Sequence, residues 1–137
     1  IADVMPIIQD NRAIVKEGLK KLHHTNNLGL QELIRVNQLE PERISPYHIG
    51  FIIGPCLNAT GRLDTAKRAL HLLCANNREE AALLAGDLKN LNESRKEMTA
   101  LGVEQAMELV ENTELNMDKV LVIYLPECHE LGWDYCG

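Results

Sequence analysis

Aromatic side chains are scarce in this sequence: phenylalanine, tryptophan and tyrosine make up only 4% of its 137 residues. The core must therefore be aliphatic, which suits helices built from Leu, Ile and Ala. No apolar run reaches the roughly 18 to 20 residues that a membrane span needs, and residues 1–12 lack the basic start and apolar centre of a signal peptide. An initiator Met is also missing, so we expect the chain to begin inside a larger protein. Its content of 45% hydrophobic and 25% charged residues is typical of a globular protein.

Paired cysteines are missing as well. None of the four cysteines stands in a CxxC pattern, which argues against a disulfide framework. They are Cys56, Cys74, Cys128 and Cys136. We therefore expect reduced thiols and a cytoplasmic protein.

An excess of basic charge is also absent, because the net charge is −6. Free-standing nucleic-acid-binding domains are usually basic, so the total argues against that class. The charge is uneven, however: acidic residues gather between Glu104 and Glu114, while Arg62, Lys67 and Arg68 lie close together. Net charge governs solubility rather than what a single cleft binds, so a local anion site stays open.

Apolar residues at helical spacing predict two short helices near the N-terminus. The first follows Asp10 and Asn11, which are good N-cap residues, and its apolar positions run from Ile14 to Leu22. The second follows Asn27, which we expect to cap it. Its buried face is predicted to consist of Leu30, Leu33 and Ile34.

Three further helices are predicted along the chain. Ser45-Pro46 is typical of an N-cap followed by a first-turn proline and indicates a short helix through Ile52. Residues 66–73 have helical spacing, and so do residues 78–112, which would form a helix on the order of 50 Å long. A helix of that length with a charged outer face more often joins two bodies than lies within one.

Residues 120–125, VLVIYL, form an apolar run rich in β-branched side chains and ended by Pro126. This pattern predicts a strand buried on both faces, as in a parallel sheet. One strand cannot stand alone. The predicted fold class is therefore mainly α: the helical end of one domain, a long connecting helix, and the first strand of another domain; the resemblance described below implies that both are α/β domains.

Residues 54–64, GPCLNATGRLD, interrupt the apolar sequence with two glycines and a proline. The simplest interpretation is a loop between two helices. The alternative is an anion site, because free backbone N–H groups near a helix N-terminus and positive glycine dihedrals suit a phosphate. The amide of Asn58 and the guanidinium of Arg62 would add to it. The chemistry alone leaves both interpretations open.

Three other polar features look like ordinary loop or helix-end residues on composition alone. Asp3 precedes Met5-Pro6, and His129 follows the predicted strand. His23-His24 could suggest a metal site, but neighbouring residues on a helix point about 100° apart. That pair is better explained as a polar helix end.

Three blocks of the sequence resemble the RecJ family of DHH phosphoesterases. They are ADVMPIIQDNRAIVKEGL, GFIIGPCLNATGRLDTAKRALHLL and LAGDLKNLNESRKEM, in that order. The resemblance implies a bacterial exonuclease that digests single-stranded DNA from the 5′ end, in DNA repair and recombination. It also implies two divalent cations, manganese or magnesium, and partners such as single-strand-binding protein and a helicase, but no membrane.

The same resemblance implies a division into domains. Residues 1–76 would be the C-terminal part of a DHH domain, residues 77–113 a connecting helix, and residues 118–137 the start of a DHH-associated domain. The active site of the family lies in the cleft between the two domains.

The resemblance assigns roles to five residues. The segment 1–7 is similar to the family's V-A-D-x-x-P-L motif, which implies that Asp3 is a metal ligand. The block 54–62 is similar to G-P-R-x-N-A-x-G-R, whose polar residues hold the DNA backbone in the family. The residues concerned are Asn58, Gly61 and Arg62. His129 matches a cleft-facing histidine and is expected to contact a phosphate.

The sequence departs from the family in three places. Cys56 stands where many relatives carry arginine, which removes one cation from the block. The Asp-His-His motif and two further ligand motifs are absent, so the chain alone is not expected to hold two cations or to cleave DNA. Residues 131–137, LGWDYCG, replace an apolar continuation that a one-base shift of suitable codons would restore, and we hypothesise a frame shift after about Glu130.

Two other functions stay open at this point. One is a DHH phosphoesterase that acts on short oligonucleotides or cyclic dinucleotides. The other is a non-catalytic relative that binds nucleic acid or scaffolds replication proteins. Intact D-x-D and D-H-H motifs in the upstream sequence would indicate an enzyme, and their absence a binding protein.

Overall fold

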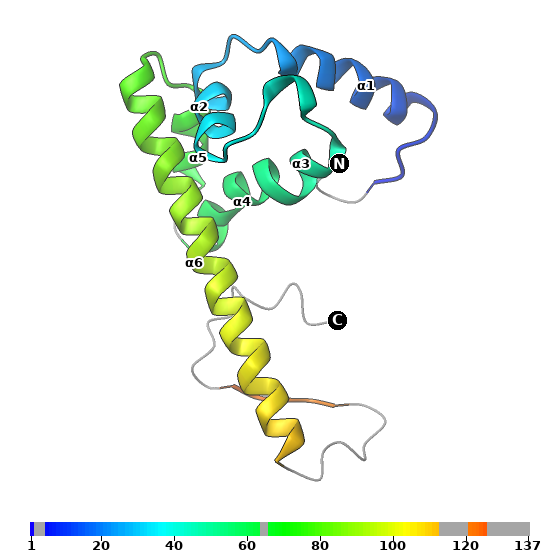
Figure 1. The fold of residues 1–137 in the computed structure, drawn as a ribbon, viewed down its shortest axis with the longest axis vertical. Helices are drawn as coiled ribbons and strands as arrows, with labels where there is room; N and C mark the ends of the chain where they lie inside the picture. Colours follow the sequence, from blue (N-terminus) through cyan, green and yellow to red (C-terminus); the bar gives the residue numbers. More distant parts are fainter. Residues whose placement is uncertain (2–4, 64–65, 113–120, 126–137) are drawn as a thin grey trace. The chain divides into compact units, whose positions relative to one another are not determined.

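The computed structural model describes residues 1, 5–63, 66–112 and 121–125, and for residues 60–63 it describes the backbone alone. Within those residues the chain is helical and contains no strand (Figure 1). The chain divides into two compact units, Ile1–Asn92 and Glu93–Gly137. The elements are α1 (Gln9–His23), α2 (Leu28–Val36), the 3-10 turn η1 (Pro41–Arg43), α3 (Pro46–His48), the π-helix η2 (Ile49–Ile53), α4 (Gly54–Leu63), α5 (Lys67–Leu73) and α6 (Arg78–Glu111).

Helix α1 confirms the first predicted helix but not its predicted caps. Its N-cap is Ile8, and Asp10 lies inside the first turn, where a carboxylate suits the positive end of the helix dipole. The amide of Asn11 donates a hydrogen bond to the carbonyl of Pro6, 3.0 Å away, rather than capping the helix. The helix ends at His23, so the His23-His24 pair lies at a polar helix end, as predicted.

Helix α2 begins where predicted, because Asn27 is its N-cap. The side-chain oxygen of Asn27 accepts a hydrogen bond of 2.9 Å from the backbone N–H of Leu30, and its amide nitrogen donates one of 2.8 Å to the carbonyl of Leu73. This residue therefore both starts α2 and ties it to the end of α5. Of the predicted buried face, Leu33 and Ile34 are buried and Leu30 is half-buried.

The helical run from Pro46 to Leu63 corrects two predictions. It starts as expected, with Ser45 as N-cap and Pro46 in the first turn, but it does not end at Ile52. It passes through the π-helix η2 into α4, so the stretch 54–64, predicted as a loop with positive glycine dihedrals, is helical up to Leu63. No described glycine has a positive φ, and Gly54 has ordinary helical backbone angles, with φ −57° and ψ −50°.

The π-helix η2 explains how a helix can contain Pro55. In a regular helix the proline ring would collide with the carbonyl four residues earlier, which here belongs to Phe51. The wider turn of η2, in which the N–H of Gly54 bonds the carbonyl of Ile49, moves those carbonyls out of the α-helical position. Burial of Cys56 and Ala59 in the next turn then stabilises the helix against its low intrinsic propensity.

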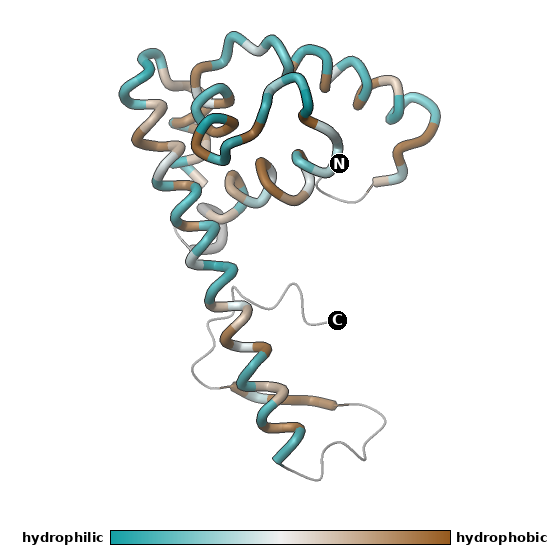
Figure 2. The backbone as a smooth tube through the Cα atoms, viewed as in Figure 1, coloured by the Kyte–Doolittle hydropathy of each residue, from teal (hydrophilic) through white to brown (hydrophobic). Residues whose placement is uncertain are grey.

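Helices α5 and α6 confirm the last two predicted helices. In the first unit α2, α5 and the first turns of α6 lie side by side, and Figure 2 shows hydrophilic and hydrophobic residues alternating along α6. The residues of α6 that are buried follow each other at spacings of three and four: Ala81, Ala85, Leu88 and Asn92. The core is aliphatic, as the composition predicted. It consists of Leu33, Ile34, Ile44, Ile53, Cys56, Leu72, Ala81, Ala85 and Leu88.

The prediction of a buried strand at 120–125 is wrong for the residues that the structure describes. Residues 121–125 have no strand hydrogen bonding, and Leu121, Val122 and Tyr124 are exposed. A strand exists only where a neighbour pairs with its backbone, and the described residues offer no such neighbour.

Asp3, His129, the tail after Glu130 and most of the predicted second domain lie outside the described residues. The division into residues 1–76, 77–113 and 118–137 remains a prediction. No described helix is long and apolar enough to cross a membrane.

Candidate nucleic-acid interface

Helix α4 carries the block that the sequence singled out for phosphate binding. Positions 54, 58 and 62 follow each other at spacings of four residues, so they share one face of the helix, and position 61, three residues after 58, lies at the edge of that face. Asn58 is exposed there. Two of the four positions are glycines, Gly54 and Gly61, so a ligand can approach the helix backbone closely on this face. The structure therefore converts a stretch predicted as a loop into a helix on which the polar positions 58 and 62 lie one turn apart.

The opposite face of α4 is buried. Cys56 is fully enclosed in the core and Ala59 is 1% exposed. The sulfur of Cys56 lies 3.8 Å from the side-chain amide of Asn37, within weak hydrogen-bonding distance. The residue at position 56 therefore faces the core in this chain, which agrees with the expectation that Cys56 makes no phosphate contact.

The backbone of α4 does not supply the anion site that the sequence suggested. The N–H groups of a helix are bonded to carbonyls one turn earlier, and that of Gly54 bonds Ile49. Arg62 lies next to the last residue of the helix, where the macrodipole is negative. The dipole there stabilises a cation and disfavours an anion by about 0.3–1 kcal/mol. Any phosphate bound on this face must be held by side chains.

Basic residues continue beyond α4. Lys67 and Arg68 lie exposed in the first turn of α5, which contains no acidic residue. Cations are unfavourable at that end of a helix by a few tenths of a kcal/mol, so helix stability does not explain their position. Together with Arg62 they bring three cationic residues into a short stretch of an acidic chain.

Two exposed aromatic residues lie in the same helical run and were not predicted from the sequence. Tyr47 and Phe51 are 61% and 63% exposed, and their rings stack with centroids 4.9 Å apart. Their separation by four residues would have shown that they share a helix face, had the run been recognised as continuous. In the sequence, the scarcity of aromatic residues indicated only that the core is aliphatic.

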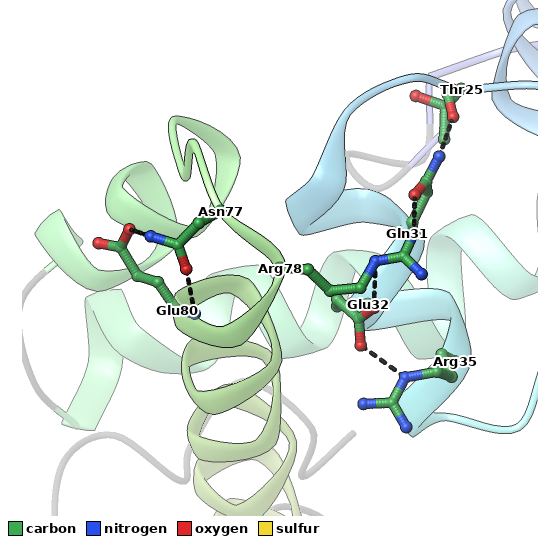
Figure 3. Close-up of polar contacts among 7 residues, drawn as sticks. All are labelled: Thr25, Gln31, Glu32, Arg35, Asn77, Arg78 and Glu80. Atoms are coloured by element: carbon green, nitrogen blue, oxygen red, sulfur yellow. Dashed lines mark hydrogen bonds and ion pairs between the residues drawn. The ribbon is translucent and has the colours of Figure 1, made fainter.

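A second polar cluster in the first unit serves the fold (Figure 3). The carboxylate of Glu32, which is 4% exposed, pairs with Arg35 on its own helix and lies 3.6 Å from the guanidinium of Arg78 at the start of α6. Arg78 also donates a 3.0 Å hydrogen bond to Gln31. Each of these three charged side chains has a partner within the chain. The contacts of Arg78 with Glu32 and Gln31 hold the start of α6 against α2.

The described residues contain no group of three or more His, Cys, Asp or Glu side chains that could hold a metal ion. Asp3 and His129, the expected metal ligand and phosphate contact, lie outside these residues. We therefore assign no step of metal chemistry to the described part of the chain. Of the predicted site residues, Asn58, Gly61 and Arg62 are brought together on one helix.

Comparisons with known proteins give consistent results. No family model matches the chain. It is 37% identical over 134 residues to the single-stranded-DNA-specific exonuclease RecJ of Bacillus subtilis, covering 98% of this chain and 16% of that protein. It is 33% identical to the Escherichia coli protein of the same name, covering 95% of this chain and 23% of that protein.

Solved structures agree with the sequence relatives. RecJ of Thermus thermophilus in complex with Mn²⁺ superposes with a TM-score of 0.83 at 31% identity, over 96% of this chain and 19% of that one. An exonuclease RecJ bound to manganese superposes with a TM-score of 0.80 at 31% identity, over 96% of this chain and 32% of that one. The chain thus spans about a third or less of the length of each relative it matches.

Proposed function

Because the chain belongs to the RecJ family of exonucleases, of which it spans one segment, we propose that the full protein hydrolyses the phosphodiester bonds of single-stranded DNA. Digestion would proceed from the 5′ end, in DNA repair and recombination. The names of the relatives, which are single-stranded-DNA-specific exonucleases, support the substrate and the reaction. In the full protein this segment would supply the end of the DHH domain, the connecting helix α6 and the start of the DHH-associated domain.

Two divalent cations, Mn²⁺ or Mg²⁺, would supply the activated water and stabilise charge at the phosphorus. Relatives whose structures were solved in complex with Mg²⁺ or Mn²⁺ support this. In this chain Asp3 would be one ligand of these ions. The remaining ligands would come from other parts of the full protein, so the 137 residues alone would be inactive.

The face of α4 formed by Gly54, Asn58, Gly61 and Arg62 would hold the sugar–phosphate backbone. The observation that carries this proposal is that positions 58 and 62 lie one turn apart on α4 and that Asn58 is exposed, whereas Cys56 and Ala59 are buried. An amide donates single hydrogen bonds to phosphate oxygens, and a guanidinium can donate two in parallel. His129 would add a phosphate contact from the second domain. Such contacts bind a strand whatever its sequence, which suits an exonuclease.

The finer biological setting follows from the same family membership. We expect the full protein to act in the cytoplasm, with single-strand-binding protein and a helicase as partners. The absence of a CxxC pattern among its cysteines fits a reducing compartment.

Substitution of Arg62 by Ala in the full-length protein tests the phosphate contact. Affinity for a 16-nucleotide single strand, measured by fluorescence anisotropy in EDTA so that nothing is cleaved, should fall about tenfold or more. The slope of log K against log salt should decrease in magnitude by about 0.7. The matched control is Arg12→Ala, an exposed arginine on α1, which should change neither quantity. A loss limited to certain base sequences, or an unchanged salt slope, would exclude the contact.

A further inference from the structure

The exposed side of the helical run before Asn58 is aromatic. Among residues 46–59 only Tyr47, Phe51 and Asn58 are exposed. The stacked rings of Tyr47 and Phe51 share one side of the run, and Asn58 follows seven residues after Phe51. No aliphatic side chain in that stretch is exposed beside them. The rim is therefore two rings followed by an amide, and it leads into the face of α4 that ends at Arg62.

The two rings form a flat pair. Their planes are inclined by 27° with centroids 4.9 Å apart, which is stacked geometry. Tyr47 also meets the ring of His48 edge-on, with centroids 5.8 Å apart. Tyr47 and Phe51 are nevertheless both more than half exposed. A third flat aromatic group can extend such a stack without any change in the fold.

Exposure of these rings is not explained by the packing of the described residues. The chain contains a single phenylalanine, and the core formed by the described residues includes no aromatic side chain. A buried aromatic side chain removes about 150–250 Å² from water, so exposing two of them side by side forgoes a sizeable stabilisation. Phe51 lies within the π-helix η2 and Tyr47 in the short helix α3 before it, and π turns are frequent at functional sites.

We propose that Tyr47 and Phe51 form a stacking platform for the bases of the DNA strand whose phosphates are held at Asn58 and Arg62. This inference rests on the proposed function and adds to it a contact to bases. Single-strand binders combine cationic contacts to the backbone with aromatic rings on which successive bases stack, and this works for every base because each has a π face. The rings and the phosphate contacts follow one another along a single helical run, as a track for one strand requires.

The test compares two strands with the full-length protein in EDTA: a 16-nucleotide oligo(dT), and the same sugar–phosphate backbone carrying abasic sites in its interior. Phe51→Ala should weaken binding of oligo(dT) about tenfold, within the 5- to 150-fold expected for loss of one stacked base. It should leave binding of the abasic strand unchanged. Tyr47→Ala should act in the same direction, and Phe51→Trp should retain wild-type affinity. Ile14→Ala on α1, also an exposed apolar residue at 69%, is the control and should change neither strand.

The outcomes separate this inference from the proposed function. Suppose that Arg62→Ala weakens binding of both strands while Phe51→Ala weakens binding of neither. This result overturns the stacking platform and leaves the phosphate contact supported. If neither variant affects either strand, both proposals are overturned. Equal losses on the two strands with Phe51→Ala, together with a lower unfolding temperature, would mean that the rings pack against another part of the full protein and would overturn the platform.

Discussion

Replacing Gly29 by Ala should destabilise the first unit, although alanine is the better helix former. Gly29 lies in α2 facing α5, and a Cβ added there would be 2.1 Å from the carbonyl oxygen of Leu72 and 2.7 Å from its carbon. Real Cβ contacts essentially never fall below 3.0 Å. The obstacle is backbone, so no side chain can rotate away, and the two helices must separate by about an ångström.

The magnitude follows from what that separation disturbs. Overpacking in a close-packed core costs about 1–3 kcal/mol. Moving the helices apart also stretches the 2.8 Å hydrogen bond from Asn27 to Leu73, which costs about 0.5–1.5 kcal/mol. Alanine has a higher helix propensity than glycine, which offsets about 1 kcal/mol of these two costs. We therefore expect a net loss of about 2 kcal/mol and a fall in Tm of roughly 5–10 °C for a chain of this length.

Gly86 provides the matched control, because the same substitution there should act in the opposite direction. It lies within α6, and a Cβ added to it meets nothing within 4 Å. Gly86→Ala should therefore raise Tm by a few degrees, since about 1 kcal/mol of helix propensity is gained without a clash. Thermal unfolding followed by far-UV circular dichroism measures both variants. If Gly29→Ala were as stable as Gly86→Ala, the close approach of α2 and α5 would be wrong.

Two further substitutions test the metal ligand and the polar cluster. In the full-length protein, Asp3→Ala should abolish metal-dependent hydrolysis while leaving single-strand affinity nearly unchanged; an unaltered turnover in a nuclease assay with Mn²⁺ would remove Asp3 from the metal site. Glu32→Gln should lower the free energy of unfolding by about 1–3 kcal/mol in urea titrations, because a buried carboxylate loses its charge-assisted hydrogen bond from Arg35 and its ion pair with Arg78. Glu93→Gln removes a half-exposed ion pair and should lower the free energy of unfolding by less than about 1 kcal/mol. Equal effects of the two variants would refute the idea that burial makes the Glu32 contacts more stabilising.

The parts of the fold that depend on local chemistry could be predicted from the sequence. Asn27 caps α2 because its side chain reaches a backbone N–H three residues away, which needs no tertiary partner. Ser45-Pro46 starts a helix for a similarly local reason. The continuous helical spacing from Arg78 defined α6 to within one residue of its end, because periodicity over many turns is a strong signal.

The parts that depend on tertiary context could not be predicted. Gly54, Pro55 and Gly61 are each poor helix formers, so the intrinsic preference of this stretch favours a loop. It becomes a helix because η2 makes room for the proline and because Cys56 and Ala59 are buried in the core. Similarly, the apolar run at 120–125 has strand composition, but a strand requires pairing with a neighbour that composition cannot supply.

The helical state of α4 changes which groups can bind the phosphate. A loop with free N–H groups would retain part of an anion site after its arginine was removed, because the backbone itself donates. In a helix those N–H groups are already bonded, and the dipole at the end near Arg62 opposes a negative ligand. Side chains must then supply nearly all of the attraction at that position. For this reason Arg62→Ala should remove most of the binding there, whereas a loop would have lost only a fraction.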